Sequence, residues 1–425
     1  MPLALLALAI SAFGIGTAEF VMMGLLPNVA GDLGTSVPTA GYLVSAYALG
    51  VVLGAPLLTA LGSRIPRKRM LLLLMALFTL GNLASAFAPG FDTLLAGRFL
   101  AGLPHGAFFG VGAVVASRLV AEDRRARAVA AMFLGLTIAN IVGVPAATAL
   151  GQNLGWRATF IVVGAIGLLA MASLALLVPN LPTEEHAGVR RELRALGDRQ
   201  VLLGLLTAVF GFAGVFAVYS YLASMMTQVS GFAPSSVTLV LALFGIGMTL
   251  GALAAGPLTD RALRPTLYGS LASLAVVLVA FHFAVQWKWA ALVAVVVLGA
   301  VGFLTTTPLQ MLVMHKARHA PTLASASNHS AFNLANAGGA WLGGAAIAAG
   351  WGWSSPALVG AVLALVGLGI AVTAGLLDRS APTPSPVVAG SSPAALTAQA
   401  APIARPERVG SPVRPHDVGS TRPGT

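Results

Sequence analysis

Cysteine is absent from the sequence, and charged residues are scarce. Of the 425 residues, 9% are charged and 57% are hydrophobic, and the mean hydropathy is +0.88. A soluble globular protein has about 25% charged residues, so this composition indicates a polytopic membrane protein surrounded by a lipid bilayer. The lack of cysteine excludes disulfides, thiolate metal sites and thiol catalysis.

Nucleotide-binding and catalytic patterns are also missing. No stretch matches G-x-x-x-x-G-K-[ST], and none of the three lysines directly follows a glycine, which argues against ATP-driven transport. A membrane enzyme would need acidic and histidine side chains gathered at one interface, and the outer loops hold only scattered polar residues. We therefore predict a protein that is not an enzyme and that uses no cofactor and no metal.

The rest of the sequence consists mainly of apolar runs. About twelve runs approach the ~20 residues that a helix needs to cross a bilayer, and they lack the alternation of barrel strands. The expected fold class is an all-α polytopic membrane protein. The runs cover residues 3–26, 39–61, 69–88, 93–117, 128–150, 157–178, 201–225, 236–258, 265–285, 289–313, 324–349 and 356–377.

Basic residues gather on one side of these segments. Sixteen follow even-numbered segments, whereas the loops on the other side hold only Arg157 and Lys288. Cytoplasmic loops are enriched in Lys and Arg, so both termini are expected in the cytoplasm. The sixteen are Arg64, Arg67, Lys68, Arg69, Arg118, Arg124, Arg125, Arg127, Arg190, Arg191, Arg194, Arg199, Arg261, Arg264, Lys316 and Arg318. Because these clusters lie between apolar segments, the net charge of +11 does not indicate a nucleic-acid partner.

The two halves of the chain repeat. "TALGSR" (59–64) follows the second apolar segment and "GPLTDR" (256–261) follows the eighth, at an offset of 197 residues (260 − 63). Such a repeat is common in secondary transporters, which bind substrate between the halves. We predict a six-helix bundle over 1–178, a cytoplasmic loop over 179–200, a second six-helix bundle over 201–377 and a disordered cytoplasmic tail over 378–425.

The repeated loop motif resembles a known family signature. "GPLTDR" is similar to the cytoplasmic motif G-x-L-a-D-r-x-G-r-k of the major facilitator superfamily, with Asp260 and Arg261 at its acidic and basic positions. The first-half copy keeps Arg64 and Arg67 but has Ser63 where the acid is expected. The resemblance implies a cytoplasmic gating motif formed by these four charged residues, and the missing acid weakens the expected charge clamp.

Two further motifs narrow the resemblance. "LLAGRFLAGLPHGAFFG" (94–110) resembles the fourth-helix motif with Arg98 as its arginine, and Gly143-Val144-Pro145 resembles the fifth-helix antiporter motif. Together they look most like the twelve-helix drug:proton antiporters, in the arabinose-efflux and chloramphenicol-resistance branch. This implies two pseudo-symmetric bundles around a cavity lined by helices one, four, seven and ten, in a monomer of the inner membrane.

One carboxylate falls inside an apolar segment. Glu19, in "GTAEFVMMG" (16–24), is the only acid that we place in a predicted membrane helix. A charge in that position costs at least ~2.5–3.5 kcal/mol on insertion scales, and low dielectric favours the protonated form of a carboxyl group. Glu19 is therefore a candidate proton carrier, with a permanently neutral or hydrogen-bonded structural residue as the alternative.

Two basic side chains accompany it. Arg98 and Glu19 are both expected roughly 9–12 Å below the outer face, at 1.5 Å per residue, so their charges can couple unless Arg98 only binds backbone carbonyls. His105 lies two turns after Arg98 on the same face and can titrate near neutral pH. The alternative for His105 is an ordinary cavity or interface histidine.

Other side chains are candidates for contact with a substrate. They are Phe20, Met23, Asn140, Tyr219, Thr305, Asn333 and Asn336. Their alternative is structural, because such polar groups often bond across helices for about 0.6 kcal/mol each and aromatic rings often only pack.

The predicted function is proton-coupled efflux of a small organic molecule, such as a drug, an antibiotic or a sugar-like metabolite, by alternating access. Roughly 150 mV of proton-motive force supplies about 3.5 kcal/mol per proton, so one carboxylate is energetically sufficient. A sugar or nucleoside importer, exporter or facilitator of the same fold remains the alternative.

The predicted orientation can be tested by cysteine labelling. In the chain with Ser36→Cys, a membrane-impermeant maleimide should react from outside the cell, because residue 36 follows the first apolar segment. Labelling from the cytoplasmic side alone would show that the orientation is inverted. The absence of native cysteines makes the signal specific.

Overall fold

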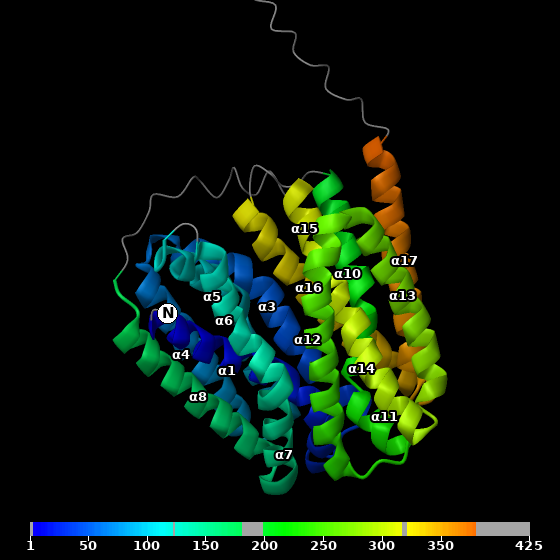
Figure 1. Cartoon of the computed structure of the whole chain (residues 1–425). Helices are drawn as coiled ribbons and strands as arrows, with labels where there is room; N and C mark the ends of the chain where they lie inside the picture. Colours follow the sequence, from blue (N-terminus) through cyan, green and yellow to red (C-terminus); the bar gives the residue numbers. More distant parts are fainter. Residues whose placement is uncertain (1–2, 122–123, 181–198, 317–320, 380–425) are drawn as a thin grey trace, which may run out of the picture. The chain divides into compact units, whose positions relative to one another are not determined.

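The computed structural model describes residues 3–121, 124–180, 199–316 and 321–379 (Figure 1). Most of the loop predicted over 179–200 and nearly all of the tail predicted over 378–425 lie outside these residues. All regular structure in the described part is helical, so the predicted fold class is confirmed.

The first half forms the N-terminal bundle. Four of its membrane crossings are single long helices, one is preceded by a short helix, and one is interrupted. The helices are α1 (Leu3–Asp32), α2 (Val37–Ala40), α3 (Tyr42–Leu61), α4 (Arg67–Ala86), α5 (Phe91–Arg118), α6 (Arg125–Ile138), α7 (Val144–Leu154) and α8 (Trp156–Leu177). A π-helical segment, Ala139–Gly143, joins α6 to α7.

The second half forms the C-terminal bundle, in which two crossings are interrupted. Its helices are α10 (Arg199–Tyr219), α11 (Leu222–Gln228), α12 (Val237–Arg261), α13 (Leu263–Ala284), α14 (Lys288–Leu304), α15 (Thr306–Lys316), α16 (Pro321–Ala348) and α17 (Ser355–Arg379). Ser220 and Tyr221 separate α10 from α11, and Thr305 separates α14 from α15.

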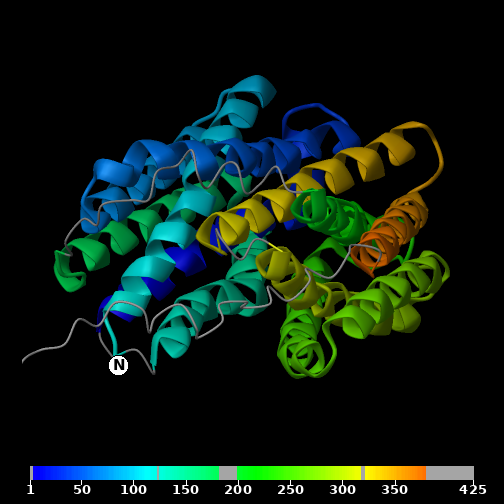
Figure 2. The same cartoon turned by 90° about the horizontal axis from the view of Figure 1, so that it is seen from above.

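Within the described residues, eleven helices are long and apolar enough to cross a membrane, judged by length and composition. The predicted segment that falls outside this group is 324–349, which α16 covers. Its 28 residues are enough to span, but the amides of Asn328, Asn333 and Asn336 make it more polar. Seen from above, α16 lies beside α3 and α10, between the two bundles (Figure 2).

One predicted boundary was wrong. The first apolar segment was expected to end near residue 26, but α1 runs through Pro27 to Asp32. The reason is a tertiary contact: Trp156 Nε1 and Arg157 donate to the Asp32 carboxylate at 2.9 and 2.6 Å. This contact holds the last turn of α1 against α8.

Glycines let pairs of helices approach backbone to backbone. A Cβ added at Gly54 of α3 would collide with the carbonyl oxygen of Leu103 on α5, and one added at Gly102 would collide with that of Tyr47. The C-terminal bundle repeats this contact between α12 and α14 through Gly251 and Gly299. These glycines lie 197 residues after Gly54 and Gly102 (251 − 54 and 299 − 102), so the repeat in the sequence is also a repeat in packing.

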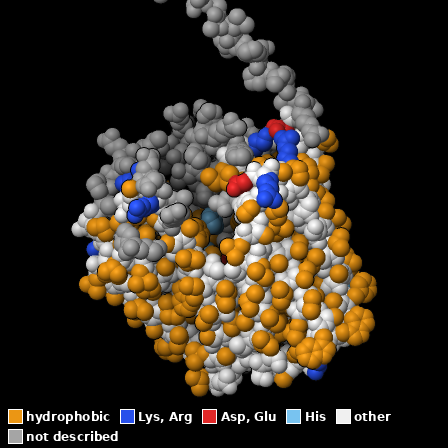
Figure 3. All heavy atoms as spheres, in the orientation of Figure 1, with side chains coloured by type: hydrophobic (Ala, Val, Ile, Leu, Met, Phe, Trp, Pro, Cys, Tyr) orange, Lys and Arg blue, Asp and Glu red, His pale blue; other side chains and the backbone are white. Residues whose placement is uncertain are grey.

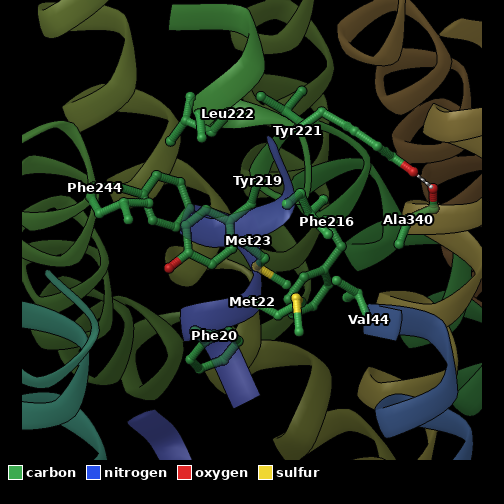
Figure 4. Packing of buried hydrophobic residues seen from close by; sticks show 14 of the residues in the cluster. Phe20, Met22, Met23, Val44, Phe216, Tyr219, Tyr221, Leu222, Phe244 and Ala340 are labelled. Atoms are coloured by element: carbon green, nitrogen blue, oxygen red, sulfur yellow. Dashed lines mark hydrogen bonds between the residues drawn. The ribbon is translucent and has the colours of Figure 1, made fainter. Parts of the chain in front are cut away.

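The bundles meet closely at the end of the molecule that holds Asp32. Ser45 Oγ on α3 donates to the carbonyl oxygen of Ala337 on α16 at 3.0 Å. The Tyr221 hydroxyl donates to the carbonyl oxygen of Ala340 at 2.8 Å (Figure 4) and lies against Gly41 of the other bundle. No space remains at Gly41 for a side chain, so the two bundles are in direct contact at this end.

Basic residues mark the opposite end, which we call the basic end. Figure 3 shows Lys and Arg side chains gathered toward it, hydrophobic side chains over the rest of this face, and a hollow between the bundles in which a histidine is visible. Arg264 and Lys316 both pair with Asp378 at this end.

The close approach of α3 and α5 predicts a stability difference between two glycines. Gly54→Ala should lower the thermal unfolding temperature in detergent, because overpacking costs typically 1–3 kcal/mol. Gly110→Ala, on α5, leaves nothing within 4 Å of the added Cβ and should leave stability equal or higher, as alanine favours a helix. Equal stability of the two variants would contradict the packing.

Candidate functional site

The carboxyl group predicted to carry protons is buried in the middle of α1. Glu19 is 6% exposed. Its charge interacts with those of Arg98 and with the Tyr47 and Tyr219 side chains. It makes no ion pair within 4.0 Å in the described part of the chain. Glu19 is thus near a cation without being fixed to it.

Arg98, on α5, is fully buried and is held mainly by neutral groups. Its Nη1 donates to the carbonyl oxygen of Ala18, the residue before Glu19, at 2.9 Å. Its guanidinium carbon lies 4.5 Å from the ring centre of Tyr47 and 5.6 Å from that of Phe160. Nε and Nη2 have no hydrogen-bond partner in the described residues. Arg98 lies near Glu19, as predicted. It also makes the backbone carbonyl hydrogen bond that the alternative interpretation describes.

His105 connects to the same group through a tyrosine. The Tyr47 hydroxyl lies 3.1 Å from His105 Nδ1, in hydrogen-bond distance, while the Tyr47 ring lies under Arg98. Both side chains are almost completely buried. The structure therefore places the three candidates for proton coupling in one neighbourhood, with Tyr47 between Arg98 and His105.

An aromatic patch next to Glu19 joins the two bundles. Phe20 of α1 lies 6.3 Å from Phe216 and 5.8 Å from Tyr219, measured between ring centres, and Tyr219 stacks on Phe244 at 4.2 Å. Met23 is buried in the same cluster (Figure 4). Two predicted cavity residues, Phe20 and Tyr219, are therefore in direct contact across the bundle interface.

Three of the predicted cavity residues lie where helices are interrupted. Asn140 is in the π segment, Tyr219 ends α10, and Thr305 separates α14 from α15. The Asn140 Oδ1 is buried without a partner in the described residues, and Thr305 Oγ1 donates to Gly302. π segments and broken membrane helices are frequent at functional sites, so the location of these residues supports a role in binding.

The two asparagines of α16 differ in their contacts. Asn333 Nδ2 donates to the carbonyl oxygen of His329 at 3.1 Å, which leaves its Oδ1 without a partner. Both polar atoms of Asn336 are buried without a partner in the described residues. Leaving a buried polar atom without a partner costs about 1–3 kcal/mol. A ligand or a water molecule that bonds to these amides would therefore be stabilised.

The residues of the predicted gating motif lie at the basic end and differ in burial. Asp260 and Arg261 are exposed at the end of α12, and Arg64 is exposed after α3, whereas Arg67 is buried at the start of α4. Asp260 forms no ion pair with any described residue. Its role as a gate stays a prediction.

Sequence reasoning missed three neighbours of this site, namely Tyr47, Phe160 and His329. Tyr47 and Phe160 hold Arg98, and His329 of α16 stacks on Phe109 and Phe133 of the other bundle. Aromatic residues in an apolar run give no local signal, but a histidine in a spanning segment is an ionisable group and could have been singled out.

The group formed by Glu19, Tyr47 and Arg98 has no polar counterpart in the second bundle. At the offset of 197 residues (216 − 19), the counterparts of Glu19, Tyr47 and Arg98 are Phe216, Phe244 and Val295. All three counterparts are buried. Since α12 and α14 approach as closely as α3 and α5, this backbone packing does not require the charged residues.

The sequence matches one family of known proteins. A family model described as Major Facilitator Superfamily matches residues 8–340. The chain is 47% identical over 360 residues to the inner membrane transport protein YdhP of Escherichia coli (strain K12), covering 85% of this chain and 92% of YdhP. It is 36% identical over 345 residues to the chloramphenicol resistance protein of Streptomyces lividans, covering 80% and 88%.

A solved structure shares the fold. The crystal structure of a D-xylose-proton symporter aligns with a TM-score of 0.71 over 87% of this chain and 96% of that chain, at 16% sequence identity. At this identity the match concerns the arrangement of helices alone.

Removing the buried charge should separate a structural role from a functional one. Arg98→Met should keep or raise the thermal stability of the protein, because a buried cation without an ion-pair partner loses hydration that a carbonyl and two rings replace only in part. A loss of about 3–5 kcal/mol, typical of breaking a required buried pair, would contradict this expectation. Arg157→Met is the matched control, since it removes an exposed pair with Asp32 worth about 0.2–1 kcal/mol.

Proposed function

The chain belongs to the major facilitator superfamily, and from this premise we propose that it exports small organic molecules in exchange for protons, with Glu19 as the proton carrier. The observation that carries the proposal is the buried carboxyl group of Glu19, near Arg98 but not paired with it. It is supported by the second bundle, where Phe216 occupies the corresponding position.

The arrangement suits a group that gains and loses a proton during transport. A carboxylate in low dielectric is disfavoured by lost hydration and favoured by a nearby cation. Arg98 is held by Ala18, Tyr47 and Phe160 rather than by Glu19. A small movement of α1 against α5 would therefore change the distance between the two charges, and with it the affinity of Glu19 for a proton. No covalent step is needed.

Substrate and proton have to influence each other for exchange to occur. Phe20 follows Glu19 in α1 and contacts Phe216 and Tyr219 of the other bundle. A molecule that inserts between these rings displaces α1, and hence Glu19. Because linkage is reciprocal, a substrate that lowers the proton affinity of Glu19 must bind less tightly when Glu19 is protonated.

The wider setting of the proposal follows from the relatives and the charge pattern. We place the protein in the inner membrane, as the name of YdhP states for that relative, with both termini in the cytoplasm and the basic end facing it. We also propose bundle limits at 1–178 and 201–377, a monomeric state and a gating role for Asp260. The name of the Streptomyces lividans relative makes chloramphenicol a reasonable first probe.

Replacing the carboxyl group should uncouple transport from the proton gradient. In inside-out vesicles with an acidic interior, the parent should accumulate a probe from a panel that begins with chloramphenicol. Glu19→Gln keeps the shape and hydrogen bonding of the side chain but cannot titrate, so accumulation should fall to the level of vesicles without the protein. Glu19→Asp should retain part of the activity.

Asp32→Asn is the matched control for this experiment. It removes one negative charge from the same helix, at an exposed pair with Arg157, and should leave accumulation and its pH dependence unchanged. If Glu19→Gln accumulates the probe as well as the parent does, with the same dependence on the gradient, Glu19 is not the carrier. Uptake driven in the opposite direction would identify an importer.

A further inference from the structure

A histidine of the C-terminal bundle stacks on two phenylalanines of the N-terminal bundle. The His329 ring, on α16, lies 6.3 Å from the ring centre of Phe109 on α5 and 6.3 Å from that of Phe133 on α6. The interplanar angles are 11° and 5°, and Phe109 and Phe133 stack on each other at 5.2 Å. We call these three side chains the His329 stack. It is an inter-bundle contact that contains a titratable group.

The stack lies between Glu19 and the basic end. His329 is eight residues after the start of α16, or about 12 Å along the helix at 1.5 Å per residue. Phe109 is nine residues before the end of α5, about 14 Å. Glu19 is sixteen residues after the start of α1, about 24 Å. A molecule or proton that moves between Glu19 and the basic end must pass the level of the stack.

A ring contact, a hydrogen bond and charge interactions link the stack to Glu19. The His105 ring lies 5.1 Å from Phe109, and a charge on His329 acts on His105. His105 bonds to Tyr47, whose side chain interacts with the charges of Arg98 and Glu19. The two histidines come from different bundles, so any movement that opens the stack also separates them.

We propose that His329 is a second proton-binding group of this transporter, and that its protonation separates the His329 stack and moves the two bundles apart at the basic end. The proposal rests on the proton coupling proposed above. At 6.3 Å between ring centres, the two phenyl rings lie at the edge of the range in which they attract a cation, and the partly exposed His329 side chain loses part of its hydration in the stack. A proton on His105 adds repulsion. The charged ring is therefore more stable where the bundles are apart and water reaches it.

The groups around His329 do not supply a competing negative charge. Of the helices packed against α16, α5 contributes His105 and α3 contributes Tyr47. The α10 helix carries Arg199 and Tyr219 at its ends, α2 has no titratable side chain, and α6, which supplies Phe133, begins at Arg125. Lys316 of α15 and Asp378 of α17 pair with each other. Arg98 and Glu19 interact with Tyr47. No described carboxylate forms an ion pair with His329, so protonation leaves a net positive charge in the stack.

The separation can be measured without knowing the substrate. Spin labels are attached at Ser117→Cys on α5 and Met314→Cys on α15, in a chain that has no other cysteine. Both sites lie near the ends of helices at the basic end. Electron–electron distance measurements are made at about pH 8 and about pH 5, the range in which histidine changes charge. In the parent, the population with the longer distance should rise about threefold or more at low pH.

Two variants and a control decide the matter. His329→Phe keeps a stacked ring but cannot bind a proton, so its distance distribution should not change with pH. If this variant is not monodisperse, His329→Gln carries the same test. His282→Gln removes a histidine that bonds to the Ser354 carbonyl oxygen, away from the stack, and should keep the response of the parent. A parent that shows no shift, or a full shift in the His329 variants, would overturn the proposal.

The outcomes separate this inference from the proposed carrier. If Glu19→Gln still accumulates the probe in vesicles while the shift depends on His329, the role of Glu19 fails and the role of His329 stands. If Glu19→Gln abolishes accumulation while His329→Phe keeps the pH-dependent shift, the role of His329 fails alone.

Discussion

Among the described residues, no carboxylate forms an ion pair with the buried guanidinium group of Arg98, and the surrounding structure is arranged around this constraint. One nitrogen donates to the Ala18 carbonyl oxygen, and the rings of Tyr47 and Phe160 cover the group. The Tyr47 ring can reach Arg98 because Gly102, one turn further along α5, lets the backbone of α3 approach at Tyr47. A single close helix contact therefore positions the cation, and through Tyr47 it also positions His105.

The repeat separates what the fold requires from what transport requires. Both bundles bring a pair of helices together through glycines 197 residues apart (251 − 54), yet only the first bundle places an acid and a base there. In the second bundle, Phe216, Phe244 and Val295 fill the corresponding positions with apolar side chains. Such packing needs no desolvated charge, so a charge retained in the first bundle indicates a function with a cost in stability.

Much of the fold could be predicted from the sequence, because hydrophobic length dominates in a bilayer and leaves few alternatives to a helix. Glu19 and Arg98 stood out for the same reason, as rare charges in apolar runs. The end of α1 could not be predicted, since it depends on the contact of Asp32 with Trp156 and Arg157, more than 120 residues away. The partners Tyr47 and His329 were also missed, because nothing in the local pattern shows which rings meet across helices.

The bundles contact each other through different kinds of groups at the two ends of their interface. At the Asp32 end, backbone approaches backbone around the Tyr221 hydroxyl, and Ser45 bonds to Ala337. Toward the basic end, the described aromatic contact between the bundles is the His329 stack. Neither set of contacts contains a described ion pair between the bundles, so exchanging one for the other breaks no described salt bridge. The difference in free energy between the states can then be small, and a ligand shifts the equilibrium only by its differential affinity for them. A proton that changes hydration between the states supplies such a difference, and this is the role proposed for the buried Glu19 and the partly exposed His329.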